Sequence, residues 1–189
     1  MRLSQPRIAA AADNALTLDQ RRVLEPLGQR GPVLNIFRTM ARAPEALTAF
    51  LAWGSYILSR RNALPERERE LVILRVGFLC KAGYEWGQHV IIGLRAGLTE
   101  AEIPRIKQGA EAPGWSPADR ALLAATDQLV KDHFVQDAAW ADLKSHFDEK
   151  ACMDFVYTVG QYTQVSMVLN TFGVQLDEGM VLDADLKGF

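Results

Sequence analysis

The stretch that decides the fold is Arg67 to Gly97, RERELVILRVGFLCKAGYEWGQHVIIGLRAG. It predicts two successive helices. Charged residues open the first helix and apolar residues follow them, and Gly83 marks the break before the second. On the second helix, Glu85 and His89 are four residues apart and share one face. An acid beside an imidazole is the minimum needed to move a proton near neutral pH. The same stretch therefore predicts helical structure and a place for chemistry.

Capping signals predict helices along the rest of the chain. Thr17 and Gln20 form a capping box, and Pro44 and Pro65 stand where proline favours a helix start. Apart from the pair in the central stretch, helices are expected over about 18–28, 44–60, 99–109, 117–134, 137–147 and 150–171. No segment shows the alternation of apolar and polar residues that is typical of a strand. The sequence thus predicts an all-α fold.

A chain of 189 residues is expected to form one domain over 1–189, with 1–16 and 174–189 as peripheral tails. The last sixteen residues are expected to be loosely ordered. The final helix is apolar nearly all round, which is typical of a helix buried on several sides. In a domain of this size, part of that burial is expected to come from a second subunit.

Composition narrows the functional classes. A net charge of −2 and a pI near 5.9 give no electrostatic reason to bind nucleic acid or anionic membranes. No apolar run reaches transmembrane length and the N-terminus lacks a signal-peptide core, so a cytoplasmic location is the expectation. Cys80 and Cys152 match no metal or disulfide framework and are interpreted as small apolar residues. No metal or cofactor is expected.

Two further residues are candidates for the centre formed by Glu85 and His89. Glu70 lies fifteen residues before Glu85, and a hairpin between the two helices would bring it level with His89. Tyr84 is a candidate donor to a developing oxyanion. Its alternative is a core aromatic residue whose hydroxyl is hydrogen-bonded at the edge of the core.

Weaker candidates surround this centre. Arg75, Arg38 and Trp86 are candidates for substrate binding, although snorkelling or an ion pair explains Arg75 better. Cys80 is a candidate nucleophile activated by His89, but nine residues separate the two, which is not one helix face. The chain has no glycine-rich phosphate loop, GxSxG or HExxH motif, so nucleotide hydrolysis, serine hydrolase and zinc protease functions are excluded.

At these residues the chain resembles the carboxymuconolactone decarboxylase family, which includes the alkyl hydroperoxidase D proteins. The matching segments are Arg67 to Ile103, NIFRTMARAPEALTAFLAW near the start, and Val159 to Glu178. The resemblance implies an all-α fold of compact helical hairpins that assembles into trimers or hexamers.

The resemblance also separates two chemistries. In the hydroperoxidase branch, a glutamate precedes a Cys-x-x-Cys pair, and a histidine follows four residues after the second cysteine. Glu70 and His89 match the acid and the histidine, but Ala82 and Glu85 stand at the cysteine positions. A cycle in which one thiolate attacks and another resolves is therefore excluded. The YE-x-x-x-H pattern resembles the non-redox branch, whose named activity is decarboxylation of a carboxylated muconolactone.

Together these observations predict a cofactor-free decarboxylase of a small unsaturated carboxylated lactone or keto acid in aromatic-compound catabolism. His89 is the expected acid–base group, tuned by Glu85 or Glu70, and Tyr84 the expected oxyanion donor. The alternatives are a double-bond isomerase acting on a similar acid, a peroxidase-related thiol protein using Cys80, and a non-catalytic oligomeric binding module. The expected partners are a small carboxylated substrate and further copies of the chain.

Overall fold

The computed structural model describes residues 3–29 and 31–188, and every regular element within them is helical. Two short 3-10 helices cover Asp13–Ala15 and Ala184–Leu186. The α-helices are α1 (Leu18–Gly28), α2 (Asn35–Met40), α3 (Pro44–Ile57), α4 (Glu66–Leu79), α5 (Gly83–Arg95), α6 (Glu102–Gln108), α7 (Pro117–Asp132), α8 (Asp137–His146) and α9 (Glu149–Phe172). The all-α prediction is confirmed for these residues.

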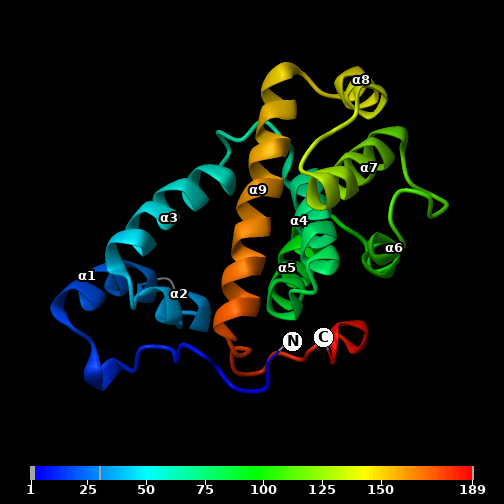
Figure 1. Cartoon of the computed structure of the whole chain (residues 1–189). Helices are drawn as coiled ribbons and strands as arrows, with labels where there is room; N and C mark the ends of the chain where they lie inside the picture. The colour runs from blue at the N-terminus through cyan, green and yellow to red at the C-terminus, as the bar shows by residue number, and fades with distance from the viewer. Residues whose placement is uncertain (1–2, 30, 189) are drawn as a thin grey trace.

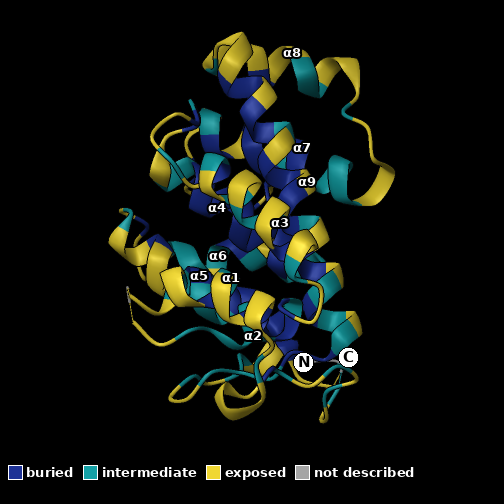
Figure 2. Cartoon of the chain, turned by 90° about the vertical axis from the view of Figure 1, so that its left-hand side faces the viewer, coloured by how far each residue is buried: buried dark blue, intermediate teal, exposed yellow. Residues whose placement is uncertain are grey.

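The long helix α9 stands at the centre of the molecule (Figure 1). On one side α3 packs against it, with α1 and α2 near the foot of α3, and on the other side α4 packs against it, followed by α5 and α7. Figure 2 shows buried residues concentrated on α4, α7 and α9, whereas α1 and α8 are largely exposed. The core therefore lies along the contact between α9 and the α4–α5 hairpin.

Helix α4 is buried around most of its circumference, from Arg69 to Gly77. Such a helix carries no solvent face on which its polar residues can be hydrated, so each one needs a partner inside the protein. Glu70 and Arg75 are the residues of α4 for which this matters most, and they find partners on different neighbouring helices.

A tight turn at Lys81, whose φ is 59°, folds α4 back into α5. The two helices then approach closely at Gly93, where an added Cβ would lie 2.8 Å from the Leu98 side chain and 3.5 Å from Cβ of Glu70. A side chain at position 93 would push α5 away from α4. This glycine therefore holds the second helix level with Glu70.

Most of the predicted helix boundaries are present. The reciprocal capping box of Thr17 and Gln20 opens α1, and the Ser116 hydroxyl accepts from the backbone of Asp119 at the start of α7. Other boundaries differ: α9 begins one residue early, at Glu149 behind an Asp148 cap, whereas α3 ends at Ile57 and α6 begins at Glu102, each three residues inside the predicted range. Helix ends are the least specified part of such a prediction, because the terminal turns are held by few hydrogen bonds.

The C-terminal segment is packed more closely than a loosely ordered tail would be. Val174 and Leu186 are buried in the core, and Lys107 of α6 forms ion pairs with Asp183 and Asp185. Asp177 accepts a hydrogen bond from the backbone N–H of Asn35 at the start of α2. The segment thus joins α2, α5 and α6.

Candidate acid–base site

Glu70, Glu85 and His89 meet at the contact between α4 and α5. Nδ1 of His89 lies 2.6 Å from Oε2 of Glu70, and Nε2 lies 2.9 Å from Oε1 of Glu85. The three residues are 2%, 4% and 6% exposed for Glu70, Glu85 and His89 respectively. The hairpin places one carboxylate at each nitrogen of the imidazole.

The two carboxylates contact His89 differently. The contact with Glu70 is an aligned hydrogen bond, whereas Oε1 of Glu85 is buried and has no aligned hydrogen-bond donor, despite its short distance to the ring. An unsatisfied buried acceptor is costly, because the group has lost its water without gaining a full replacement. Glu85 therefore retains capacity to accept a proton or a hydrogen bond from another group.

The carboxylates determine the charge of His89. Burial alone lowers the pKa of an imidazole, but the charge of Glu85 and the hydrogen bonds and charge of Glu70 outweigh burial and raise the pKa of His89 from 6.5 to about 10. At neutral pH the ring is an imidazolium between two acids. In that state the ring can donate a proton but has no free nitrogen with which to accept one.

A cavity of about 590 Å³ opens beside this centre. Glu85 and His89 line it from α5, while Glu70 lies behind the ring and is not part of the lining. Its apolar wall includes Leu27, Phe37 and Phe50. A volume of this size accommodates a small organic molecule against a largely apolar surface, with a few polar groups at one end.

Tyr162 and Gln161 of α9 also line the cavity, and the sequence analysis missed both as site residues. The ring of Tyr162 packs edge-on against His89, with centroids 4.9 Å apart. Its hydroxyl makes no hydrogen bond to the described residues, and Oε1 of Gln161 is likewise buried without a partner. The sequence did contain a signal for these two residues, since they are polar side chains in an otherwise apolar helix.

Tyr162 is a neutral phenol at every ordinary pH. Burial, followed by the charges of Glu85 and Glu70, raises the pKa of its hydroxyl well above 10, with Arg69 opposing the shift. A neutral hydroxyl facing a cavity can donate a hydrogen bond to a ligand oxygen. Tyr162 thus brings to the cavity a hydroxyl whose proton no described residue accepts.

Tyr84 lines the cavity, but its hydroxyl proton is already used in a hydrogen bond within the protein. Its hydroxyl donates a short hydrogen bond to Asp177, which also accepts from Nε2 of Gln88 at 2.9 Å. Burial and this hydrogen bond raise the pKa of Tyr84 above its usual range. The geometry matches the alternative reading of Tyr84, in which a core aromatic residue has its hydroxyl bonded at the edge.

The three residues considered for substrate binding lie elsewhere. Arg75 is buried on the far side of α4, where it pairs with Asp127 through two nitrogens at 2.6 and 2.8 Å. Arg38 pairs with Asp13, and Trp86 is buried against Phe78. None of the three lines the cavity beside His89. The ion-pair interpretation of Arg75 matches this geometry, with the partner on α7.

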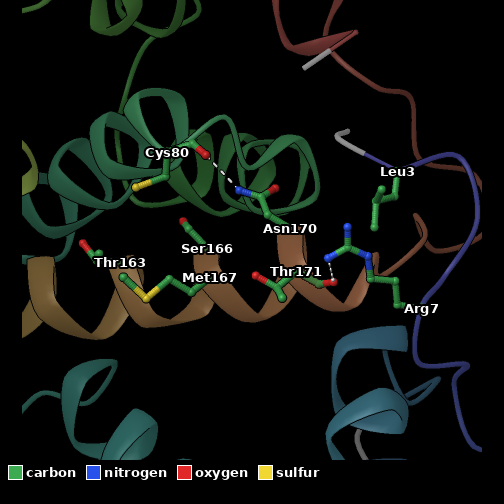
Figure 3. Close-up of a pocket in the computed structure, with 8 residues that line it drawn as sticks. All are labelled: Leu3, Arg7, Cys80, Thr163, Ser166, Met167, Asn170 and Thr171. Atoms are coloured by element: carbon green, nitrogen blue, oxygen red, sulfur yellow. Dashed lines mark hydrogen bonds between the residues drawn. The ribbon is translucent and has the colours of Figure 1, made fainter.

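Cys80 lines a different cavity, of about 470 Å³, together with Ser166 and Asn170 of α9 (Figure 3). The backbone carbonyl of Cys80 accepts a hydrogen bond from the Asn170 side chain at 2.8 Å. Cys80 and Cys152 are not joined by a disulfide. Because Cys80 and His89 face separate cavities, activation of this thiol by His89 has no support in the geometry.

The described part of the chain has neither a metal-binding cluster nor a membrane-spanning helix. No group of three or more His, Cys, Asp or Glu side chains there is arranged to hold a metal ion. No described helix combines the length and apolar character needed to cross a membrane.

Comparison with known proteins relates this geometry to one family. The model of the carboxymuconolactone decarboxylase family matches residues 44–128, which span α3 to most of α7. Residues 44–128 of the chain are therefore similar to this family. The matched region contains Glu70, Glu85 and His89 but ends before Tyr162 and Asp177. No curated protein sequence matches the chain significantly.

Several solved structures share the fold of this chain. A peroxidase-related protein with an alkyl hydroperoxidase D core, from Ralstonia eutropha JMP134, is 23% identical with a TM-score of 0.78, covering 92% of this chain and 93% of its own. A peroxidase-related protein from Silicibacter sp. TM1040 is 18% identical with a TM-score of 0.76, covering 98% of both chains.

A third similar structure is that of the debrominase Bmp8 in complex with 2,3,4-tribromopyrrole. It is 15% identical with a TM-score of 0.75, covering 97% of this chain and 95% of its own. At these identities the likeness establishes the alkyl hydroperoxidase D-like fold alone. The chemistry of this chain must be argued from its own residues.

Proposed function

We propose that this protein is a cofactor-free enzyme that moves a proton on a small unsaturated carbonyl compound. One observation carries the proposal: a buried imidazolium lies between two carboxylates, and one of these carboxylates has an unfilled acceptor oxygen at an apolar cavity. Buried ionisable groups grouped in this way at a cavity are typical of catalytic sites.

In the proposed reaction Glu85 is the base. Its Oε1 removes a proton from the carbon beside the substrate carbonyl, and the electron pair of that C–H bond moves into the conjugated system as a dienolate. Glu85 then returns the proton to a more distant carbon, so that a double bond has moved and no atom is gained or lost. A positioned acid–base group of this kind typically contributes about 10²–10⁴-fold to the rate.

The neighbouring residues support this step. Tyr162 donates to the oxygen on which negative charge develops, as a group fixed in place before the reaction begins. His89 holds Glu85 in position through its charge, and Glu70 fixes the ring by its 2.6 Å hydrogen bond to Nδ1. In these roles Glu85 and Tyr162 touch the substrate, while Glu70 and His89 position and stabilise Glu85.

Decarboxylation of a carboxylated lactone or keto acid is the second candidate reaction, and the family match favours it. Loss of CO₂ would leave the same dienolate, which Tyr162 would stabilise and one of the acids would protonate. The two reactions differ only in which bond to carbon breaks first.

A single experiment separates these reactions. The purified protein is incubated in D₂O with β,γ-unsaturated lactones and with matched unsaturated oxo acids, and deuterium uptake and CO₂ release are followed by NMR and gas analysis. Deuterium uptake without CO₂ supports the isomerase, and CO₂ release supports the decarboxylase. Binding of these compounds with neither signal contradicts an enzymatic function and favours a binding module.

The thiol alternative is tested by replacing Cys80. Cys80 is the residue directly after α4 and lines a cavity other than the one beside His89. We expect Cys80→Ala to leave proton transfer unchanged. Peroxide-dependent turnover by the wild type that is lost in Cys80→Ala would instead establish a peroxidase-related function.

We further propose that the chain works as a homo-oligomer. Met153, Tyr157 and Met167 are apolar or aromatic residues exposed on α9, whose opposite side is buried in the core. Light scattering at micromolar concentration should give a mass that is a multiple of the 21.0 kDa chain, and a monomer would contradict the proposal.

A further inference from the structure

The charges around the proposed base indicate which substrates the cavity accepts. Glu70 and Glu85 bring two acidic side chains to the two nitrogens of His89, whose imidazole is protonated at neutral pH. Arg69, the residue before Glu70 on α4, is buried, and its charge acts on the nearby Tyr162 hydroxyl. The buried cluster thus combines two acidic with two basic side chains.

Neither cation is available to bind an anion from the cavity. Each nitrogen of His89 already faces a carboxylate within 2.9 Å. Arg69 donates through Nη1 to the backbone carbonyl of Ser59 at 3.3 Å. Its buried Nε has no partner among the described residues, but Arg69 is not part of the cavity lining. Among the described residues that do line the cavity, none is a lysine or an arginine.

The polar groups that do face the cavity suit an uncharged ligand. The unfilled oxygen of Glu85 would repel a second carboxylate, which can only accept hydrogen bonds. Tyr162 can donate to a carbonyl oxygen, and Gln161 can present either its oxygen or its NH₂ group, because rotation of the amide exchanges the two. A carbonyl group on an apolar frame satisfies these groups without adding a buried charge.

We propose that the substrate of this cavity is an uncharged unsaturated lactone or ketone, held by its carbonyl oxygen at Tyr162 and Gln161, and not a free carboxylate. This inference rests on the proposed function and makes it specific. It departs from the sequence-based expectation of a carboxylated substrate, because a carboxylate buried here would have no cation to pair with.

A pair of probes with the same skeleton tests the inference. We use a γ-phenyl β,γ-unsaturated butenolide, which is uncharged, and benzoylpropionate, the carboxylate formed when that lactone opens. The methyl ester of benzoylpropionate separates the effect of charge from that of ring opening. At pH 7 we expect the lactone and the ester to bind at least about tenfold more tightly than the carboxylate in calorimetric titrations, a factor equivalent to about one unit of log Kd.

A designed cation should reverse this preference. Ser55 is exposed on α3 and lines the cavity, so Ser55→Arg would place a guanidinium at its edge. We expect the variant to gain affinity for benzoylpropionate about tenfold while its affinity for the ester stays within about twofold. Ser55→Gln is the matched control, which adds length and hydrogen-bonding groups without charge and should leave the preference of the wild type in place.

Three results would overturn the inference. Benzoylpropionate could bind as tightly as its ester, or neither uncharged probe could bind at millimolar concentration. The third result concerns Arg30, which lies outside the described residues and is replaced by Gln in a parallel sample. If benzoylpropionate binds to the wild type but not to Arg30→Gln, a cation does serve the cavity. By contrast, uncharged probes that bind tightly but take up no deuterium from D₂O would contradict the proposed reaction and leave the inference on ligand charge intact.

Discussion

Helix α4 carries two buried charged centres, and comparing them shows how a structural site differs from a functional one. On one side Glu70 meets His89 and Glu85, and on the other Arg75 meets Asp127 and the carbonyls of Ile106 and Lys107. The Arg75 centre uses all three guanidinium nitrogens in hydrogen bonds. The His89 centre leaves one carboxylate oxygen unfilled beside a cavity.

The difference teaches that burial of charge is not in itself a sign of function. A buried charge whose hydrogen-bonding capacity is filled holds helices together, here α4 to α6 and α7. A buried charge that retains capacity at a cavity is costly to the fold and available to a ligand. Experiments on one centre should therefore change stability, and experiments on the other should change turnover.

The largest effect we expect is a loss of stability at alkaline pH that comes from the His89 centre. The pKa of His89 is raised from 6.5 to about 10 in the folded protein, so the folded state holds this proton more tightly than the unfolded state. The resulting stabilisation is complete below about pH 6.5 and is lost as the pH rises towards 10. Denaturant titrations should show the free energy of unfolding falling by several kcal/mol over that window.

The control for this prediction is a histidine outside the centre. His133→Asn alters an exposed residue at the end of α7 and should keep the pH dependence of the wild type. His89→Gln should remove most of it, since an amide does not titrate. The Arg75 centre adds nothing in this window, because guanidinium keeps its proton throughout. A wild-type slope unchanged in His89→Gln would show that the imidazolium does not stabilise the fold.

The next effect concerns turnover. Glu85→Gln keeps the shape of the side chain but removes the base, and we expect it to lower kcat by about 10²–10⁴-fold. His89→Ala should lower kcat at least about a hundredfold while the helical fold stays intact, because the charge that holds Glu85 is lost. Steady-state kinetics on the lactone that gives the strongest deuterium uptake provide the measurement. A Glu85→Gln variant with wild-type kcat would remove Glu85 from the mechanism.

The Arg75 centre should respond in the opposite manner. Arg75→Met leaves Asp127 and two carbonyls without their donor, and we expect it to lower the free energy of unfolding by about 2–4 kcal/mol. Its kcat, measured well below the unfolding temperature, should stay within about twofold of the wild type. Arg38→Met is the comparison variant, since the Arg38 pair with Asp13 is largely exposed on the acid and should contribute below about 1 kcal/mol.

The smallest expected effect separates the two tyrosines. Tyr162→Phe removes the proposed donor to the oxyanion and should lower kcat by about tenfold to a hundredfold with little change in stability. Tyr84→Phe removes a hydrogen bond to Asp177, so it should lower the free energy of unfolding by about 1 kcal/mol and leave kcat within about threefold. If the two variants exchanged these outcomes, Tyr84 would be the oxyanion donor, as the sequence first suggested.

Much of this molecule could be predicted from local signals. Capping residues such as Thr17, Pro44 and Ser116 identify helix starts because they act within three residues of themselves. The contact of Glu85 with His89 follows from helical spacing, and the approach of Glu70 follows from a hairpin, whose turn lies at Lys81 just before the glycine at which a break was predicted. These features depend on short separations along the chain, which a sequence displays directly.

What could not be predicted depends on long separations. The sequence contains two tyrosines of similar surroundings, Tyr84 and Tyr162, and only the approach of Asp177 decides that the first is occupied and the second is available. Likewise, Arg75 finds its partner 52 residues away on α7. Spacing within a helix gives no information about such partners, so the roles of both residues needed the fold.

The position of Asp177 also affects the order in which the molecule can fold during its synthesis. This residue lies after α9 along the chain, and it bonds the start of α2 and the side chains of Tyr84 and Gln88. A nascent chain can form the α4–α5 hairpin well before these contacts exist, since folding can proceed from the N-terminal side during synthesis. The side of the cavity formed by Tyr84 and Gln88 is therefore completed only once the segment after α9 has been synthesised.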